Sequence, residues 1–294
     1  MFTGSFVALV TPFRNGKIDF EKLDLLVEFH VEAGTNGLVP CGTTGESATL
    51  SHEEHEQIIN RVVKRADGRI PVVAGTGSNS TQEAIRLTRF AREAGADAAL
   101  LITPYYNRPT QKGLVAHFEA VAKAVSQTAG DFPLILYNVP SRTGVNMLPQ
   151  TVIECSEFPN VVGIKEASGN VDQTVEILRG SEMVVLSGDD SLTLPLMAVG
   201  AKGVISVAAN VVPKLMVDLV DLASAGDFLG AQELHFRLFP LFKALFVETN
   251  PIPVKAAMAL QGRIGPELRL PMTPLSEANL KHLELVLSEL GVLG

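Results

Sequence analysis

One complete β-α-β unit lies in PVVAGTGSNSTQEAIRLTRFAREAGADAALLI, residues 71–102 of the chain. Its two ends are short apolar runs, Pro71–Ala74 and Ala98–Ile102, which favour strands. Between them, Thr81–Ala94 has the spacing of an amphipathic helix, and Ser80 stands where the N-cap of that helix belongs. Because the runs are apolar on both faces and do not alternate, they indicate strands of a buried parallel sheet.

The same alternation of apolar run and amphipathic stretch occurs eight times, which predicts an α/β fold of the closed (β/α)8 TIM barrel type. Ser51 is a second expected N-cap. The other strands are expected at Phe6–Leu9, Gly37–Pro40, Leu134–Tyr137, Val161–Lys165, Met183–Leu186 and Gly203–Val207, with helices at Phe20–Glu32, Glu53–Ala66 and Leu114–Ser126. An open dinucleotide-binding sheet would need GxGxxG after the first strand, but Thr11-Pro12-Phe13 follows it instead.

The chain continues beyond the eighth strand with helical patterns at Lys214–Ala225, Gly230–Phe246, Val254–Leu260 and Glu277–Leu290. We expect the barrel to occupy residues 1–225 and a C-terminal helical extension to occupy residues 226–294. No stretch rich in Gly, Ser or charge separates the two parts. The extension is therefore expected to pack on the barrel and not to fold alone.

The overall composition excludes several classes of protein. The formal net charge is −8 and no basic cluster with interleaved aromatic residues occurs, which argues against nucleic-acid binding. No apolar run approaches the roughly 20 residues of a membrane helix, and Met1–Arg14 is typical of a first strand rather than a signal peptide. Cys41 and Cys155 are too few for a disulfide framework or a zinc site. We expect a soluble protein of the reducing cytoplasm.

Lys165 is the candidate nucleophile. It ends an apolar strand, and (β/α)8 enzymes hold their active sites at the carboxyl ends of the strands. Desolvation by an apolar wall favours the neutral amine that a nucleophile needs. The alternative is a structural ion pair with Glu166 or Asp189.

Three other strand ends carry groups that suit the same chemistry. Tyr137 ends the preceding strand and can pass protons beside Lys165; the alternative is a core tyrosine. The turn Gly42-Thr43-Thr44-Gly45 can bind a carboxylate through its backbone N–H groups, or be a plain turn with threonine caps. Arg142, in a loop after the fifth strand, suits capture of a substrate carboxylate, or is a surface arginine.

Metal chemistry has little support in the sequence. The string His52-Glu53-Glu54-His55 is similar to HExxH, but its histidines are three residues apart and that motif needs four. We therefore expect no metal and no cofactor. Cys41 is interpreted as strand packing and not as a nucleophile.

Four motifs taken together carry a family resemblance. They are GTTGES at residues 42–47, YYNRP at 105–109, YNVPSRTG at 137–144 and GIKEA at 163–167. In this order they resemble the dihydrodipicolinate synthase family, within the pyruvate-dependent class I aldolase and lyase superfamily. The resemblance begins at residues 1–5 and reaches LPMTP at residues 270–274, so it covers essentially the whole chain.

The resemblance implies covalent chemistry with pyruvate. Lys165 is expected to form the Schiff base, and Tyr137, Thr43 and Tyr106 are expected to relay protons. In the family the tyrosine at the position of Tyr106 comes from a neighbouring subunit, which implies a homo-oligomer, usually a tetramer built as a dimer of dimers.

The resemblance also implies the partners of the reaction. Pyruvate is expected to contact Thr44 and the backbone of Ile205. Arg142 is expected to receive the carboxylate of L-aspartate 4-semialdehyde. The implied product is 4-hydroxy-tetrahydrodipicolinate, at the first committed step toward diaminopimelate and lysine.

Feedback inhibition by L-lysine is the last implication of the resemblance. A carboxylate such as Glu83 can hold a cationic amine. The alternative is an ordinary helix start capped by Ser51 with two solvated histidines. The implied lysine site consists of Ser47, Ala48, His52, His55, Asn79, Glu83 and Tyr105.

Two competing functions stay open from the sequence. A sister enzyme such as N-acetylneuraminate lyase or a keto-deoxy-sugar aldolase would share Lys165 and Tyr137, but its sugar substrate gives no reason for Arg142. A non-catalytic barrel that senses a ligand would lack the lysine or the relay, and both are present.

Overall fold

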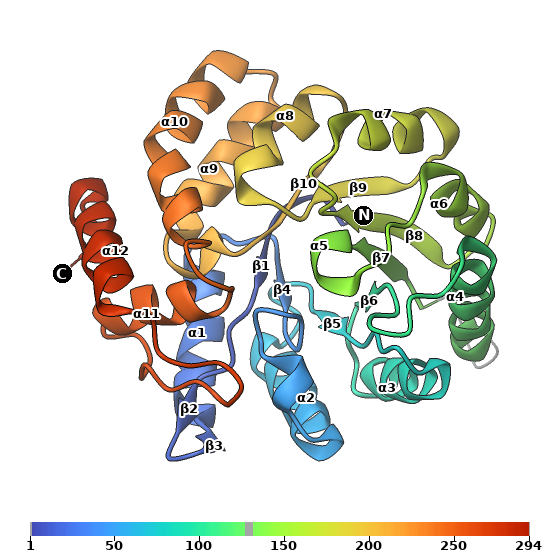
Figure 1. Ribbon diagram of the computed structural model, residues 1–294, viewed down its shortest axis with the longest axis horizontal. Coiled ribbons are helices and arrows are strands. Elements are labelled where there is room, and N and C mark those ends of the chain that lie inside the picture. The colour runs from blue at the N-terminus through green and yellow to red at the C-terminus, as the bar shows by residue number, and fades with distance from the viewer. Residues whose placement is uncertain (1, 127–131, 294) are drawn as a thin grey trace.

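A computed structural model describes residues 2–126 and 132–293 of the chain. Eight parallel strands form one sheet in the order β4-β1-β10-β9-β8-β7-β6-β5. Its two end strands also meet, because Leu38 N donates to the carbonyl oxygen of Pro71 at 2.8 Å and Leu38 bridges Val72. The predicted (β/α)8 TIM barrel is therefore confirmed (Figure 1).

The barrel strands alternate with helices along the chain. The strands are β1 Gly4–Ala8, β4 Gly37–Val39, β5 Val73–Gly75, β6 Ala98–Ile102, β7 Leu134–Asn138, β8 Val161–Glu166, β9 Val184–Ser187 and β10 Gly203–Ser206. The helices around them are α1 Phe20–Glu32, α2 His52–Ala66, α3 Thr81–Glu93, α4 Gln111–Ser126, α6 Pro149–Ser156, α7 Val171–Gly180, α8 Thr193–Ala198 and α9 Pro213–Ser224. Ser51 and Ser80 cap α2 and α3 as predicted.

Both faces of the strands are buried, which explains their unbroken apolar runs. Alternate residues such as Phe6, Val73 and Leu186 fill the barrel interior. Their neighbours, such as Val7 and Leu101, join a larger core between the strands and the surrounding helices. The barrel interior is thus a packed core.

Two local features differ from the sequence expectation. Arg142 was expected in a loop but lies in the short helix α5, Pro140–Thr143, where Pro140 fits the first helical position. The residues after the first strand form a hairpin of β2 Phe13–Arg14 and β3 Lys17–Ile18, which are too short to show a pattern. Strand and helix ends otherwise lie within three residues of the predicted ones, with the largest difference at the start of α4, which begins at Gln111 and not at Leu114.

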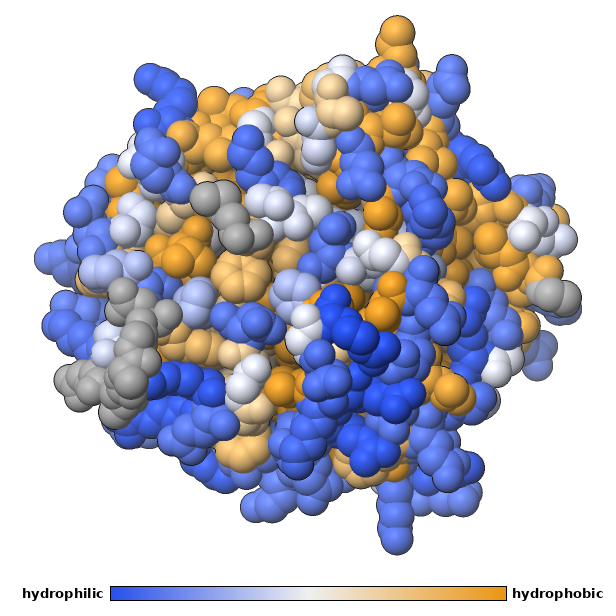
Figure 2. Space-filling model, turned by 180° about the vertical axis from the view of Figure 1, so that it is seen from behind, coloured by the Kyte–Doolittle hydropathy of each residue, from blue (hydrophilic) through white to orange (hydrophobic). Residues whose placement is uncertain are grey.

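The C-terminal helices are α10 Phe228–Ala244, α11 Ile252–Leu260 and α12 Glu277–Leu290. Helix α10 packs against α9, and α12 packs against α10 and α11, beside the barrel (Figure 1). The division after residue 225 stays a prediction. No helix in the described ranges is long and apolar enough to span a membrane. Figure 2 shows hydrophilic and hydrophobic residues intermixed on the face opposite to that of Figure 1.

Candidate active site

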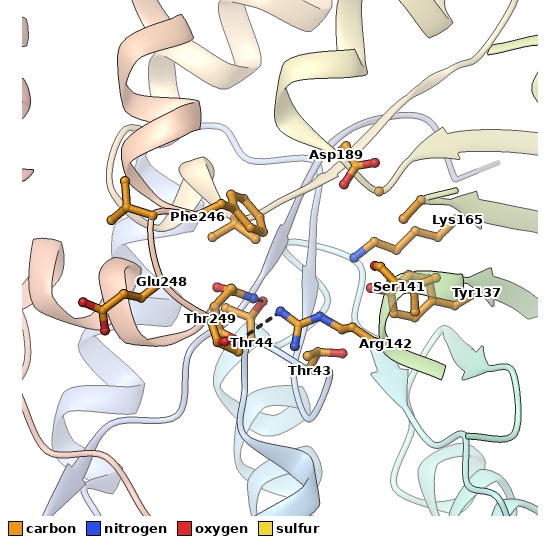
Figure 3. A pocket seen from close by; sticks show the side chains of 16 residues that line it. Thr43, Thr44, Tyr137, Ser141, Arg142, Lys165, Asp189, Phe246, Glu248 and Thr249 are labelled. Carbon is orange, nitrogen blue, oxygen red and sulfur yellow. Dashed lines mark hydrogen bonds between the residues drawn. The ribbon is translucent and has the colours of Figure 1, made fainter. Parts of the chain in front are cut away.

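A cavity of about 720 Å³ opens at the carboxyl ends of the strands. Its wall brings together five predicted site residues from four different segments of the chain: Thr43, Thr44, Tyr137, Arg142 and Lys165. Residues 246–250, which link α10 to α11, close the opposite side (Figure 3). Both the barrel and the C-terminal extension therefore contribute to this cavity.

Lys165 and Tyr137 occupy paired positions on neighbouring strands β8 and β7. The Lys165 Nζ lies 4.4 Å from the centroid of the Tyr137 ring. Both side chains are almost buried, with 5% and 7% of their surfaces exposed, yet both reach the cavity. An amine and a phenol thus meet where a substrate carbonyl can approach both of them.

The acidic neighbours of Lys165 do not form an ion pair with it in the described part of the chain. Glu166 turns to the opposite face of its strand, where Asn138, Gln173 and the Ser168 N–H donate to its carboxylate. Asp189 lines the cavity near Lys165; burial raises the pKa of its carboxyl group and the Lys165 charge opposes this rise. The Lys165 amine is consequently left facing the cavity (Figure 3).

Gly188 makes room for the Lys165 side chain. A Cβ atom at Gly188 would lie 3.1 Å from Lys165 Cε and 2.5 Å from the Ala167 Cβ. The second contact is closer than carbon atoms tolerate, so a larger residue would displace the lysine or its strand. Sequence reasoning assigned no role to Gly188, because this close approach depends on the neighbouring strand.

The turn Gly42–Glu46 presents Thr43 and Thr44 to the cavity. Glu46 N donates to the Thr43 carbonyl oxygen at 3.1 Å, which closes the turn. Thr44 is buried, and its Oγ1 accepts a hydrogen bond of 3.0 Å from Asn250 Nδ2. The hydroxyl of Thr44 is therefore held by the C-terminal extension.

Arg142 extends from α5 across the cavity toward the same linker (Figure 3). Its Nη2 donates to the carbonyl oxygen of Asn250 at 3.1 Å. Asn250 thus holds both Thr44 and Arg142, a role that its position in the sequence does not reveal. The remaining guanidinium N–H groups can receive a carboxylate in the cavity.

Two of the predicted site residues do not present their side chains to this cavity. Ile205 is fully buried in the barrel interior and does not line the cavity. Tyr106 has a left-handed backbone with φ of 70° and is 91% exposed on the surface of the chain. In the single chain Tyr106 is therefore separate from the cavity that holds Lys165.

A second cavity of about 410 Å³ gathers most of the implied lysine-binding set. The residues of this set that line the second cavity are Ser47, Ala48, His52, His55, Glu83 and Tyr105. Asn79 lies beside it and donates to the Tyr105 carbonyl oxygen at 3.2 Å. Thr43, Tyr137 and Arg142 line both cavities, so the two cavities share a wall.

The two histidines of the second cavity have partners within the protein. The His55 ring donates from Nε2 to the Gly75 carbonyl oxygen at 2.7 Å, and burial lowers its pKa. His52 Nε2 lies 4.0 Å from Glu83 Oε1. Cys41 also lines this cavity, but burial raises the pKa of its thiol, which keeps it a poor nucleophile.

Comparisons with known proteins agree over the full length of the chain. The sequence model of the Dihydrodipicolinate synthetase family matches residues 1–290. The 4-hydroxy-tetrahydrodipicolinate synthase of Nitratidesulfovibrio vulgaris is 57% identical over 295 residues, covering 99% of each chain.

Solved structures give the same result. The crystal structure of dihydrodipicolinate synthase from Aquifex aeolicus is similar at a TM-score of 0.96 with 52% identity, covering 99% of each chain. The enzyme from Cyanidioschyzon merolae with lysine bound is similar at a TM-score of 0.95 with 40% identity, again covering 99% of each chain.

Proposed function

The chain belongs to the dihydrodipicolinate synthetase family, and on this premise we propose that it condenses pyruvate with L-aspartate 4-semialdehyde to give 4-hydroxy-tetrahydrodipicolinate. The observation that carries the proposal is the pairing of Lys165 with Tyr137 on neighbouring strands at one cavity. As the first committed step toward diaminopimelate and lysine, the reaction belongs in the cytoplasm.

Schiff-base formation begins at the free amine of Lys165. Its nitrogen attacks the keto carbon of pyruvate to form a carbinolamine, and loss of water gives the imine. Each stage moves a proton, and Tyr137 suits this transfer because its ring contacts the lysine amine. Thr43 lines the same cavity and extends the relay away from Tyr137.

Carbon–carbon bond formation follows from the imine. Loss of a methyl proton gives the enamine, whose carbon adds to the aldehyde of the second substrate. The amine of that substrate then displaces Lys165 by transimination, which closes the ring and restores the free lysine. No other covalent group is required in this sequence of steps.

Carboxylates of the two substrates need separate sites. Thr44 lines the same cavity as Lys165 and, with the backbone of Ile205, is proposed to bind the carboxylate of pyruvate. Arg142 reaches across the cavity and suits the carboxylate of the semialdehyde. A sugar aldehyde would offer hydroxyl groups there and would leave the guanidinium charge without a partner.

Completion of the relay requires a second copy of the chain. Tyr106 is exposed on the surface and does not line the cavity of its own chain, so it does not serve Lys165 there. We infer a dimer in which each subunit supplies Tyr106 to its neighbour, and a tetramer built from two such dimers.

L-lysine is the proposed inhibitor, and the second cavity is its proposed site. Glu83 can hold an ammonium group, and the wall shared with the active site couples the two cavities. The lysine-bound relative from Cyanidioschyzon merolae supports this assignment. Millimolar L-lysine should inhibit the wild type and inhibit Glu83→Ala much less; equal inhibition of both would exclude this site.

The reaction itself is tested by a choice between two aldehydes. Purified protein receives pyruvate with either L-aspartate 4-semialdehyde or N-acetylmannosamine, and product is followed by mass spectrometry. We expect turnover with the semialdehyde alone. Preferential turnover of N-acetylmannosamine would assign the chain to the sugar lyases and refute the proposal.

A further inference from the structure

We propose that the buried ion pair between Glu46 and Lys255 is a positioning device that holds the Thr43–Thr44 turn in place for proton transfer. The inference deepens the proposed function and rests on it. It makes the C-terminal extension a working part of the active site, since Lys255 belongs to α11 and Glu46 to the turn after β4.

The pair is fully removed from solvent. Lys255 Nζ donates to Glu46 Oε1 at 2.6 Å, and 0% and 2% of the two side chains are exposed. The same amine donates to the Thr11 carbonyl oxygen at 2.9 Å. The other carboxylate oxygen of Glu46 accepts from the Arg269 N–H at 3.1 Å. These three hydrogen bonds of the two side chains therefore join segments far apart in the sequence.

An aromatic ring and a second ion pair surround these charges. Lys255 Nζ and Arg269 Cζ each lie 4.4 Å from the centroid of the Phe13 ring. Arg269 forms two hydrogen bonds of 2.6 Å to Glu54, in the first turn of α2. The turn and the helix that follows it are thus fixed to the same C-terminal segment.

The turn itself has a backbone that needs support. Cys41 and Glu46 stand at its two ends with φ of 57° and 55°, in the left-handed region that side chains other than glycine disfavour. Such a conformation persists only where the surrounding structure enforces it. The hydrogen bonds of the Glu46 carboxylate provide that restraint next to Thr43 and Thr44.

The extension also reaches the turn from its other side. Asn250, just before α11, donates from Nδ2 to Thr44 Oγ1. The turn is consequently held at Thr44 and at Glu46 by residues five positions apart in one C-terminal segment. A displacement of that segment would move the relay hydroxyl of Thr43 away from the cavity wall it shares with Tyr137.

The test uses Glu46→Asp, which keeps the charge but shortens the side chain by one methylene. The shorter carboxylate can reach Lys255 and the Arg269 N–H together only if the turn moves. We expect the variant to fold and to form the borohydride-trapped pyruvate adduct on Lys165 to the wild-type extent at equilibrium. Its kcat should fall roughly tenfold or more, since small misplacements of catalytic groups have large effects on rate. Lys255→Arg, which also keeps its charge, is measured in the same way.

A double-mutant cycle separates positioning from plain stability. In a Thr43→Val background, Glu46→Asp should change kcat less than about twofold, because its effect acts through Thr43. Arg61→Met, which removes an exposed pair with Asp24 on the outer side of α2, is the matched control and should leave kcat unchanged.

Three results would overturn the proposal. The first is a folded Glu46→Asp variant whose kcat lies within about twofold of wild type, and the second is an equal loss of kcat from Glu46→Asp in the wild-type and Thr43→Val backgrounds. The third is unfolding of both Glu46→Asp and Lys255→Arg. Wild-type protein that forms no adduct on Lys165 would instead defeat the proposed function, so the two failures are distinguishable.

Discussion

The Lys165 side chain contacts the Tyr137 ring of the neighbouring strand β7 and passes close to Gly188, which follows the other neighbouring strand β9. Strand-end placement made Lys165, Tyr137 and the threonine turn predictable, because the active-site face of the barrel follows from topology. Gly188 and Asn250 could not be assigned in this way. Their roles depend on distances to residues that the sequence does not place beside them.

Removal of the Arg142 side chain tests the carboxylate site. Arg142→Ala loses charge-assisted hydrogen bonds worth about 1.5–3 kcal/mol, so kcat/KM for the semialdehyde should fall roughly 10- to 150-fold. Adduct formation with pyruvate alone should persist, because Lys165 and Tyr137 are untouched. Steady-state kinetics and borohydride trapping measure the two effects, and equal damage to both would make Arg142 a structural residue.

His30 predicts an acid sensitivity of the fold. Burial lowers its pKa from 6.5 to about 3, with Arg263 adding to the effect. Below pH 6.5 the His30 side chain is protonated in the unfolded chain but stays neutral in the folded chain. The free energy of unfolding therefore keeps the whole His30 contribution above pH 6.5 and loses it progressively as the pH falls from 6.5 to 3. Each pH unit in this window removes roughly 1.4 kcal/mol.

The measurement is urea unfolding of wild type and His30→Gln at pH 7 and pH 5. His30 Nδ1 pairs with Thr35 Oγ1, and glutamine can keep a hydrogen bond there. The loss of unfolding free energy between the two pH values should be about 2 kcal/mol smaller in the variant. Identical pH dependence would show that His30 takes up its proton in the folded state.

Among the elements, helix α2 illustrates what a sequence motif can predict on its own. Ser51 accepts from the Glu54 N–H, and the Glu54 carboxylate accepts from the Ser51 N–H. These two hydrogen bonds form a complete capping box five residues after the turn that ends at Glu46. This local signal was predictable, whereas the Glu54 pair with Arg269 was not. The two residues of that ion pair are 215 positions apart in the sequence.

Loss of the cap should weaken the protein without stopping catalysis. Ser51→Ala removes one hydrogen bond at the start of α2, which should lower the unfolding free energy by about 1 kcal/mol. Ser288→Ala, on the exposed face of α12, is the control and should change stability far less. Urea titration compares the three proteins, and equal stability of all three would contradict a role for the cap.

For the whole molecule, eight repeats of one pattern were enough to predict the barrel, because a closed parallel sheet satisfies strands that are apolar on both faces. The long-range contacts of the extension were not predictable. Lys255 and Glu46 are 209 residues apart in the sequence, and the residues next to each of them do not indicate a buried ion pair. The extension's contribution to the cavity became visible only with the fold.

The proposed sharing of Tyr106 between subunits makes a prediction for mixed assemblies. Lys165→Ala and Tyr106→Phe should each be nearly inactive alone. A heterodimer of the two contains one site with both residues intact, so random mixing should restore about a quarter of wild-type activity. The two variants are co-expressed in equal amounts, purified together through one common tag without selection for mixed pairs, and assayed; a mixture no more active than its parts would contradict the shared site.

The central claim is that Lys165 is the covalent catalyst, and borohydride trapping tests it most directly. Wild-type protein is incubated with pyruvate, reduced with borohydride, digested and analysed by peptide mass. One reduced pyruvyl group should appear on Lys165, and Lys165→Ala should keep its fold while acquiring no label. Label on any other lysine, or a labelled Lys165→Ala, would contradict the account.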